Sequence, residues 1–180
     1  MTDMTARDVA EILGMVERKG IRVWVDGGWA VDALLGRQTR HHADLDIVIE
    51  QKDLAAVVDM LHTRGYGPAH RNNPRPWNFA LGDGVRHEVD FHVIVLDENG
   101  NGIYGPPANG ELYPADALKG IGAIRSRAVA CTSPQWLVKS HSGYALDEDD
   151  RADLRALCRK FGIPLPAEIM VSPRVRRASL

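Results

Sequence analysis

The segment "VWVDGGWAVDALLGRQTRHHADLDIVIE", from Val23 to Glu50, constrains the fold more than any other part of the chain. A short β-branched and aromatic run predicts a strand, "DGG" turns the chain, and "WAVDALL" predicts a helix that ends at Gly36. "LDIVIE" is apolar at nearly every position, which is typical of a strand covered on both faces. The order strand, helix, strand therefore predicts a sheet with helices packed against it.

The spacing of apolar residues predicts further helices on both sides of this segment. Thr5 and Asp8 resemble a capping box, and an amphipathic stripe follows them. The same periodicity recurs across residues 54–61 and 154–161. Another helix is expected from 134 to about 144. The chain therefore alternates helix and strand at first and becomes helical towards its end.

The middle of the chain reads as sheet. Strand-like runs between residues 66 and 96 are separated by Asn-Pro and Gly-Asp-Gly turns, and 97–109 is expected to be a loop or hairpin. We therefore predict an α/β (α+β) fold with a short mixed sheet backed by helices. The expected parts are a main lobe over 1–112, a helical C-terminal part packed on it over 113–170, and a mobile basic tail over 171–180.

Composition narrows the classes of function. The chain has 180 residues and a net charge of −2, which suits one domain and lacks the basic field of nucleic-acid-binding proteins. No apolar run approaches the length of a membrane span, and the first residues do not have a signal-peptide pattern. Cys131 and Cys158 show no metal-type spacing and indicate reduced thiols. We expect a cytoplasmic protein without nucleic-acid or membrane partners, and we leave a homodimer open.

Three aspartates are spaced so that their carboxylates can converge. Asp44 and Asp46 lie two residues apart at the start of a strand and project from one face. Asp90 lies in "HEVDFHV", where Glu88 and His92 share its face. If the two strands are neighbours, the three aspartates meet and need a cation. Hard divalent ions suit such a site, with Mg²⁺ expected and Mn²⁺ as an alternative, and two ions can clamp a phosphoryl transfer.

Each of these features also has a simpler interpretation. A D-x-D pair near a strand end is usually solvated turn chemistry, but an aspartate in the apolar run around Asp90 is poorly placed for a core strand. Gly27 and Gly28 fit either a tight strand-to-helix turn or a close approach of phosphate to a helix N-terminus. Arg37 and Arg40 precede the acidic pair, and they are either solvated or directed at phosphate oxygens.

Two other signals are discounted. "DENGNG", which starts at Asp97, begins like a calcium loop, but Ala108 occupies the position of the bidentate Glu. A polar hairpin turn is the better interpretation. The seven histidines form no H-E-x-x-H motif or Cys/His framework, so structural or surface roles are expected for them in general.

The segment "GGWAVDALLGRQTRHHADLDI" resembles the signature of antibiotic nucleotidyltransferases of the DNA polymerase β-like superfamily. In that pattern a Gly-Gly turn precedes D-x-D, and a later strand supplies a third carboxylate. "VDFHVIVLDENGN" and "HSGYALDEDDRADLRAL" are similar to the small lincosamide enzymes. The resemblance implies a polymerase β-like nucleotidyltransferase fold with residues 1–112 as its catalytic lobe. It also implies Mg²⁺-dependent adenylyl transfer from ATP to a hydroxyl of a small antibiotic.

The resemblance further implies roles for individual residues. Metal binding and catalysis would fall to Asp44, Asp46 and Asp90, with Asp90 as a ligand or general base. Nucleotide contacts would come from the glycine turn, the following loop and a later helix, through Gly27, Gly28, Arg37, Arg40 and Lys139. Acceptor contacts would come from Glu88, His92 and Tyr144.

The acceptor and the class of function leave alternatives open. The acidic run Asp147–Asp150 could attract a polycationic aminoglycoside, or it could be a helix N-terminus that favours negative charge. A lincosamide is expected, and an aminoglycoside is the alternative. A non-catalytic nucleotide-binding module or a toxin–antitoxin partner is disfavoured by the intact aspartate trio. Transfer onto protein or RNA is a third alternative, and the near-neutral charge argues against RNA.

Overall fold

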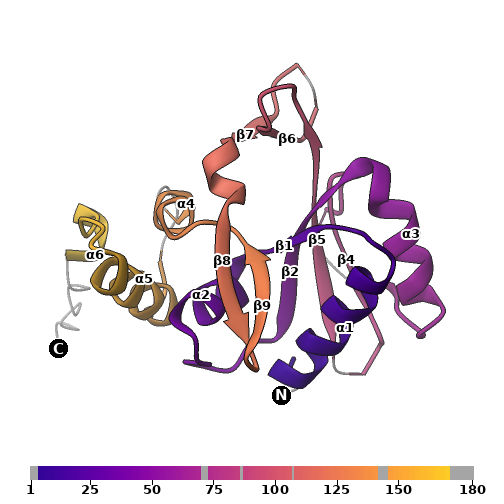
Figure 1. Ribbon diagram of the computed structural model, residues 1–180, viewed down its shortest axis with the longest axis horizontal. Helices are drawn as coiled ribbons and strands as arrows, with labels where there is room; N and C mark the ends of the chain where they lie inside the picture. The colour runs from indigo at the N-terminus through magenta and orange to yellow at the C-terminus, as the bar shows by residue number, and fades with distance from the viewer. Residues whose placement is uncertain (1–3, 70–72, 86, 107, 142–145, 171–180) are drawn as a thin grey trace, which may run out of the picture.

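The computed structural model describes residues 4–69, 73–85, 87–106, 108–141 and 146–170. Its centre is one mixed sheet in the order β3-β4-β5-β2-β1-β9-β8, and β6 and β7 extend it from the far half of β5 (Figure 1). β2 pairs in parallel with β5, as β1 does with β9. The strands are β1 (Val23–Val25), β2 (Asp44–Glu50), β3 (Gly67–Pro68), β4 (Asn78–Gly82), β5 (Glu88–Leu96), β6 (Gly102–Tyr104), β7 (Glu111–Tyr113), β8 (Gly120–Ile124) and β9 (Arg127–Cys131).

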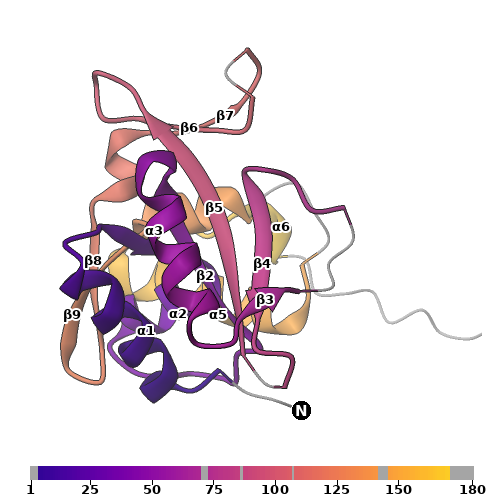
Figure 2. The same ribbon diagram turned by 90° about the vertical axis from the view of Figure 1, so that its right-hand side faces the viewer.

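Helices pack on the sheet from different sides. In Figures 1 and 2, α1 and α3 lie on one side of β2 and β5, whereas α5 and α6 lie at the opposite end of the molecule. The β6–β7 hairpin projects beyond the main sheet in both views. The helices are α1 (Ala6–Arg18), α2 (Gly27–Leu35), α3 (Gln51–His62), the 3₁₀ helix η1 (Ala115–Leu118), α4 (Pro134–Ser140), α5 (Glu148–Phe161) and α6 (Ala167–Met170).

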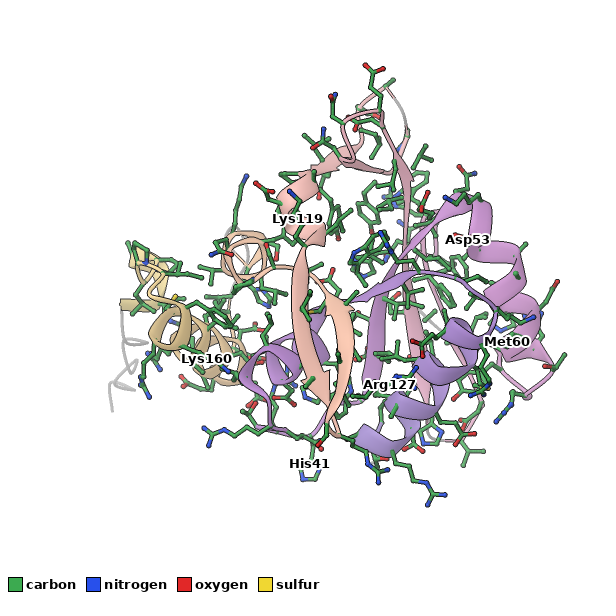
Figure 3. All side chains as sticks on the ribbon, in the orientation of Figure 1. His41, Asp53, Met60, Lys119, Arg127 and Lys160 are labelled. Atoms are coloured by element: carbon green, nitrogen blue, oxygen red, sulfur yellow. The ribbon has the colours of Figure 1, made fainter. Side chains whose placement is uncertain are left out.

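The helix ends follow the signals in the sequence. The predicted capping box at the start of α1 is confirmed, because the Thr5 side chain accepts from the Asp8 N–H and the Asp8 carboxylate accepts from the Thr5 N–H. The predicted end of α2 at Gly36 is also confirmed, since this glycine adopts φ 77°. Figure 3 shows Lys160 of α5, whose Nζ donates to the carbonyl oxygen of Leu34 at 2.8 Å. This bond ties the last described long helix to the C-terminus of α2.

Alternation along β2 and β5 separates two apolar layers. Leu45, Ile47 and Ile49 point into the larger core, together with Phe91 of β5. The opposite face carries Val48 and Ile94, which pack with Trp24 and Tyr113 in a smaller core. The period of two in a strand therefore assigns the even-numbered positions of both strands, including the aspartates, to the second face.

The polar turn after β5 matches its predicted role. The Asp97 carboxylate accepts from the N–H groups of Asn99 (2.9 Å) and Asn101 (2.8 Å), which closes the hairpin to β6. The side-chain bond from Asn101, offset in part by desolvation and reinforced by these backbone bonds, lowers the pKa of Asp97. The interpretation as a hairpin turn is therefore confirmed.

The helical character predicted from residue 113 onward is wrong for residues 120–131. This segment forms the antiparallel hairpin β8–β9, and Val25 pairs with Cys131 to join it to the sheet. Arg125 and Ser126 at its turn have φ values of 49° and 63°. Hairpin turns with left-handed residues usually contain Asn or Gly. This turn contains Arg and Ser instead, so the sequence did not predict it.

The helical part therefore begins at Pro134 rather than at 113. α4 ends at Ser140 with His141 as its C-cap. Residues 142–144 of the predicted helix, like the predicted tail over 171–180, lie outside the described residues. The boundary between a catalytic lobe and a C-terminal part stays a prediction. Among the residues that the structure describes, no helix is long and apolar enough to cross a membrane.

The packing of α2 on β8 predicts a strong effect of a single methyl group. A Cβ at Gly122 would lie 2.6 Å from the Ala33 carbonyl oxygen and 2.8 Å from the Ala33 Cβ. Because backbone atoms cannot swing aside, Gly122→Ala should lower the free energy of unfolding by about 1–3 kcal/mol. Urea denaturation measures this. The matched control is Gly67→Ala, since nothing lies within 4 Å of a Cβ there. Equal midpoints for the two variants would contradict the tight α2–β8 contact.

Candidate active site

The parallel register of β2 and β5 brings the predicted carboxylates together. Asp44 is paired with Glu88, Asp46 with Asp90, and Val48 with His92. The prediction that Asp46 and Asp90 lie on adjacent strands is therefore confirmed. Their side chains leave the sheet on the same face, because aligned positions in neighbouring strands point the same way.

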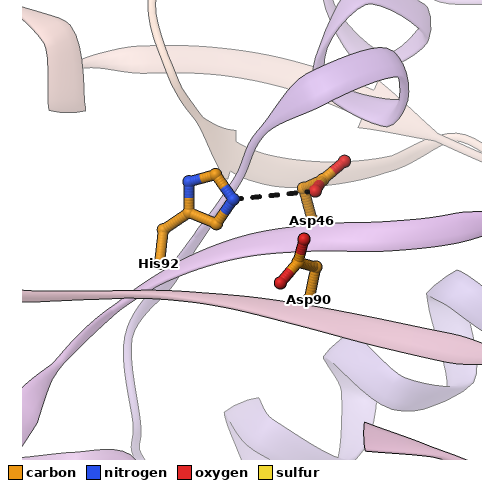
Figure 4. Close-up of side chains that lie close together, drawn as sticks. All are labelled: Asp46, Asp90 and His92. Carbon is orange, nitrogen blue, oxygen red and sulfur yellow. Dashed lines mark ion pairs between the residues drawn. The ribbon is translucent and has the colours of Figure 1, made fainter. Parts of the chain in front are cut away.

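Asp46, Asp90 and His92 form a compact group (Figure 4). One potential ligand atom from each lies within 4.8 Å of the others. The His92 Nε2 is 3.7 Å from Asp46 Oδ1, and only 5% of Asp90 is exposed. The sequence placed His92 on the correct face but suggested only an acceptor contact for it. Its spacing of two residues from Asp90 was the signal for this closer association.

The charge of His92 reduces the repulsion between the two aspartates of this group. Burial lowers the pKa of His92, but the close contact with Asp46 and the charges of Asp26, Asp46 and Asp90 raise it to about 9. At neutral pH the imidazole therefore carries a positive charge beside the carboxylates. The charged His92 therefore offsets part of the repulsion between the carboxylates of Asp46 and Asp90.

Asp44 and Glu88 lie at the edge of this group. Both are half-buried and face each other at the start of β2 and β5. Asp44 is not part of the three-residue group, although it lies on the same face two positions before Asp46. It stays a predicted ligand, and Glu88 stays a predicted acceptor contact.

Gly27 makes room for the Asp46 carboxylate. It opens α2 with φ 57°, a conformation that glycine adopts readily, and a Cβ on it would collide with Asp46 Oδ2. The Asp26 N–H donates to the Asp46 carbonyl at 2.9 Å, which holds the end of β1 against β2. The N-terminus of α2 is therefore fixed directly beside the acidic group.

Gly28 makes room for two polar side chains from the following loop. A Cβ there would lie 2.5 Å from His42 Nδ1 and 2.6 Å from Arg40 Nη2. The Arg40 Nε also donates to the buried Asp153 of α5 at 3.0 Å. Arg40 thus stands next to the helix N-terminus, as a phosphate ligand would, while it anchors α5. Arg37 is exposed just after α2.

A buried cluster under this loop explains its shape. The Asp32 carboxylate lies 2.5 Å from His42 Nε2, and it accepts from the Thr39 N–H at 2.9 Å. His42 also packs on Trp29, with ring centroids 4.6 Å apart. A structural role for His42 is therefore confirmed. The cluster fixes the loop that delivers the chain into β2.

Asp26 is a buried carboxylate that the sequence motifs did not single out. Its Oδ1 accepts from the Thr132 hydroxyl at 2.7 Å, and its Oδ2 accepts from the Tyr113 hydroxyl at 3.4 Å. His92 Nδ1 lies 3.2 Å from the same tyrosine oxygen. Burial and then the charge of Asp26 raise the pKa of Tyr113, so this hydroxyl keeps its proton. Only the position of Asp26 directly before the glycine pair could have signalled it.

Aromatic residues continue this polar network outwards. Tyr113 packs on Trp136, with centroids 4.8 Å apart, and Tyr104 stacks near His92 at 5.7 Å. Trp136 and the exposed Lys139 line a cavity of about 440 Å³ beside α4. The Lys139 Nζ lies 5.7 Å from the Trp136 ring centroid. Tyr144, the other predicted residue of this wall, lies outside the described residues.

The acidic run before the last long helix has a local explanation. Asp147 is the N-cap of α5, and it forms a reciprocal capping box with Asp150. Negative charge at a helix N-terminus is favoured by the unpaired N–H groups there. The interpretation as a helix start is confirmed, so the run gives no separate support to a polycation site.

The environment of Gly28 leads to a test of its role. Gly28→Ala should lower the free energy of unfolding by about 1–3 kcal/mol, because the new Cβ would displace the His42 ring and the Arg40 guanidinium. Thermal and urea denaturation measure this, and nucleotide affinity is measured in parallel. If stability were unchanged and only nucleotide affinity fell, the glycine would serve phosphate approach rather than packing.

Comparison with known proteins places this geometry in a family. A family model described as aminoglycoside-2''-adenylyltransferase matches residues 8–157. A lincosamide resistance protein of Staphylococcus haemolyticus is 28% identical over 159 residues, which cover 86% of this chain and 95% of that protein. A 2''-aminoglycoside nucleotidyltransferase of Escherichia coli is 39% identical over 59 residues, 31% of this chain and 33% of that protein.

Solved structures give the same result. The lincomycin-bound crystal structure of the lincosamide antibiotic adenylyltransferase LnuA has a TM-score of 0.77 at 28% identity, covering 90% of this chain and 99% of that chain. ANT(2'')-Ia in complex with adenylyl-2''-tobramycin has a TM-score of 0.66 at 20% identity, covering 87% and 89%. The predicted nucleotidyltransferase fold is therefore confirmed. Since the family model spans most of the chain, the protein belongs to the aminoglycoside-2''-adenylyltransferase family of antibiotic nucleotidyltransferases.

Proposed function

We propose that this protein transfers the adenylyl group of ATP to a hydroxyl of a lincosamide antibiotic. The observation that carries the proposal is the near full-length similarity to LnuA, in both sequence and fold. The pairwise match to the 2''-aminoglycoside nucleotidyltransferase of Escherichia coli covers only 59 residues. An aminoglycoside acceptor is the alternative.

The donor set of the acidic group fits a divalent cation. Asp46 and Asp90 supply the oxygen atoms that Mg²⁺ and Mn²⁺ prefer, and the group is compact enough for one ion. Asp44 is a further proposed ligand on the same face. When bound, the ion would stabilise the negative charge that develops on the phosphate oxygens. The same carboxylates argue against a non-catalytic module, which would have no need of buried like charges.

The surrounding residues provide a phosphate site. The N-terminus of α2 offers the N–H groups of Gly27 and Gly28, and its partial positive charge favours an anion. Arg40 stands beside Gly28, and Lys139 extends from α4. We assign the triphosphate to this corner, with Arg37 as an outer contact.

Asp90 is the proposed general base. In the transfer, the acceptor oxygen bonds to the α-phosphorus of ATP, the bond to pyrophosphate breaks, and the hydroxyl proton must leave. Asp90 is the most buried carboxylate of the acidic group and lies on the face that also carries Asp46. It is therefore suited to take this proton if it reaches the acceptor hydroxyl.

The acceptor would lie over the second face of β2 and β5. Tyr104 and Trp136 offer aromatic surface there beside the buried Tyr113, and Glu88, His92 and Tyr144 stay the proposed polar contacts. Asp147 and Asp150 of the acidic run are engaged in capping α5. An apolar wall of this kind suits the sugar and alkyl parts of a lincosamide better than a polycation.

Removal of one ligand carboxylate tests the cation site. Asp46→Asn should reduce adenylylation of lincomycin at least about 100-fold, because the ion contributes several kcal/mol to the transition state. Mass spectrometry of the antibiotic measures this in the presence of Mg²⁺ and ATP. Asp59→Asn on the exposed face of α3 is the matched control and should act like the wild type. Normal turnover by Asp46→Asn would leave this carboxylate with a structural role only.

A competition assay tests the acceptor. Lincomycin and a panel of aminoglycosides are offered together with Mg²⁺ and ATP, at low and moderate salt. We expect adenylyl adducts of lincomycin that depend little on salt, since a weakly charged acceptor gains little from long-range attraction. Adducts of aminoglycosides alone, weaker at higher salt, would overturn the lincosamide assignment and leave the adenylyl transfer intact.

A further inference from the structure

Asp26 occupies a helix N-cap position without serving as a cap. It precedes α2, where an aspartate side chain normally accepts from the N–H groups of the first turn, and it makes no such bond. Instead, its carboxylate turns towards the sheet and is only 7% exposed. A buried carboxylate that gives up its local partners must be held by others, and here these lead to the candidate cation site.

The contacts of Asp26 form a short hydrogen-bonded chain that leads to His92. An ionised carboxylate only accepts hydrogen bonds. Its two oxygens receive the hydroxyl hydrogens of Thr132 (2.7 Å) and Tyr113 (3.4 Å). The single hydroxyl hydrogen of Tyr113 is then used, so its oxygen accepts from His92 Nδ1 at 3.2 Å. A hydrogen on His92 Nδ1 suits this arrangement, because Nδ1 faces the Tyr113 oxygen and lies 3.7 Å from Asp26 Oδ2.

This arrangement determines which nitrogen faces the acidic group. With Nδ1 directed at Tyr113, Nε2 lies on the side of Asp46, 3.7 Å from its Oδ1. The same ring stacks on Tyr104, with centroids 5.7 Å apart and planes 26° apart. The ring is thus held at its edge by hydrogen bonds and at its face by an aromatic neighbour.

We propose that Asp26 is a positioning residue of the divalent-cation site, and that it acts through Tyr113 to present His92 Nε2 as a third ligand beside Asp46 and Asp90. The inference rests on the cation site of the proposed function, and binding of the cation would displace the proton from His92 Nε2 to the solvent. Histidine ligands of metals commonly donate their other N–H to a carboxylate, or to a group held by one, which fixes the ring. An imidazole ligand favours Mn²⁺ over Mg²⁺, which takes oxygen ligands almost exclusively.

The backbone around Asp26 gives this arrangement its rigidity. Asp26 follows β1 and Thr132 follows β9, and the Thr132 N–H donates to the Val25 carbonyl at 2.9 Å. The Asp26 N–H donates to the Asp46 carbonyl at 2.9 Å. The residue that orients His92 is therefore bound to the strand that carries the aspartate ligand. A shift of one would move the other.

Binding of Mn²⁺ alone to the full chain tests the proposal without turnover. Electron paramagnetic resonance of free Mn²⁺ gives the dissociation constant. Asp26→Asn and Tyr113→Phe should each weaken Mn²⁺ binding about 10- to 100-fold, the usual effect of losing an outer partner of a ligand. The matched controls are Asp59→Asn and Tyr66→Phe, which remove a carboxylate charge and a phenol hydroxyl away from the site. Both should bind Mn²⁺ like the wild type.

A double-mutant cycle distinguishes positioning through His92 from a general structural effect. In a His92→Ala background, Asp26→Asn should cause no further loss of Mn²⁺ affinity. An equal loss in both backgrounds, or wild-type affinity in folded Asp26→Asn and Tyr113→Phe, would overturn the proposal. Melting curves report folding, and Tyr113→Phe carries the test if Asp26→Asn does not fold. If the wild-type protein bound no Mn²⁺, the cation site of the proposed function would itself be contradicted.

Discussion

The parallel pairing of β2 with β5 is the interaction on which the rest of the structure depends. It sets Asp46 beside Asp90 on one face of the sheet, where two negative charges in a partly buried place oppose folding. The opposite face supplies the compensation, because Leu45, Ile47 and Phe91 are fully buried there. Each such side chain contributes about 1.5–3 kcal/mol on burial. The strands are therefore held by their apolar face, which leaves the polar face available for chemistry.

The polar face is kept in order by groups that neutralise or orient one another. His92 carries a positive charge beside Asp46, and the network of Asp26 and Tyr113 fixes its ring. Near the N-terminus of α2, Arg40 pairs with the buried Asp153 and so joins the loop before β2 to α5. Buried polar groups of this kind stabilise only when they are satisfied together. The helical end of the chain is thereby coupled to the position of the strand that carries the aspartates.

The sequence predicted those parts of the site that depend on the two-residue alternation of side chains along a strand. Alternation in "HEVDFHV" put Asp90 and His92 on one face of their strand, and the D-x-D spacing put Asp44 and Asp46 on one face of theirs. That the two faces are the same follows from the register of β2 and β5 in the structure. Asp26 could not be interpreted in the same way, because its partners Tyr113 and Thr132 come from distant segments. Thr132 directly follows the β8–β9 hairpin, whose Arg-Ser turn lacks the usual signal. A side chain defined by long-range contacts has no signature in its neighbours.

The same geometry bears on how one nucleotide site can serve different acceptors. Function within a fold lies in the site and can change while the scaffold persists. Trp136 borders the proposed acceptor side through its ring contact with Tyr113, so we infer that it can vary without disturbing the acidic group. Tyr113 touches both Trp136 and the bonds that orient His92. A change at Tyr113 would therefore alter the acceptor wall and the cation site together. It follows that changes in acceptor preference should arise from substitutions at residues near Tyr113 rather than at Tyr113 itself.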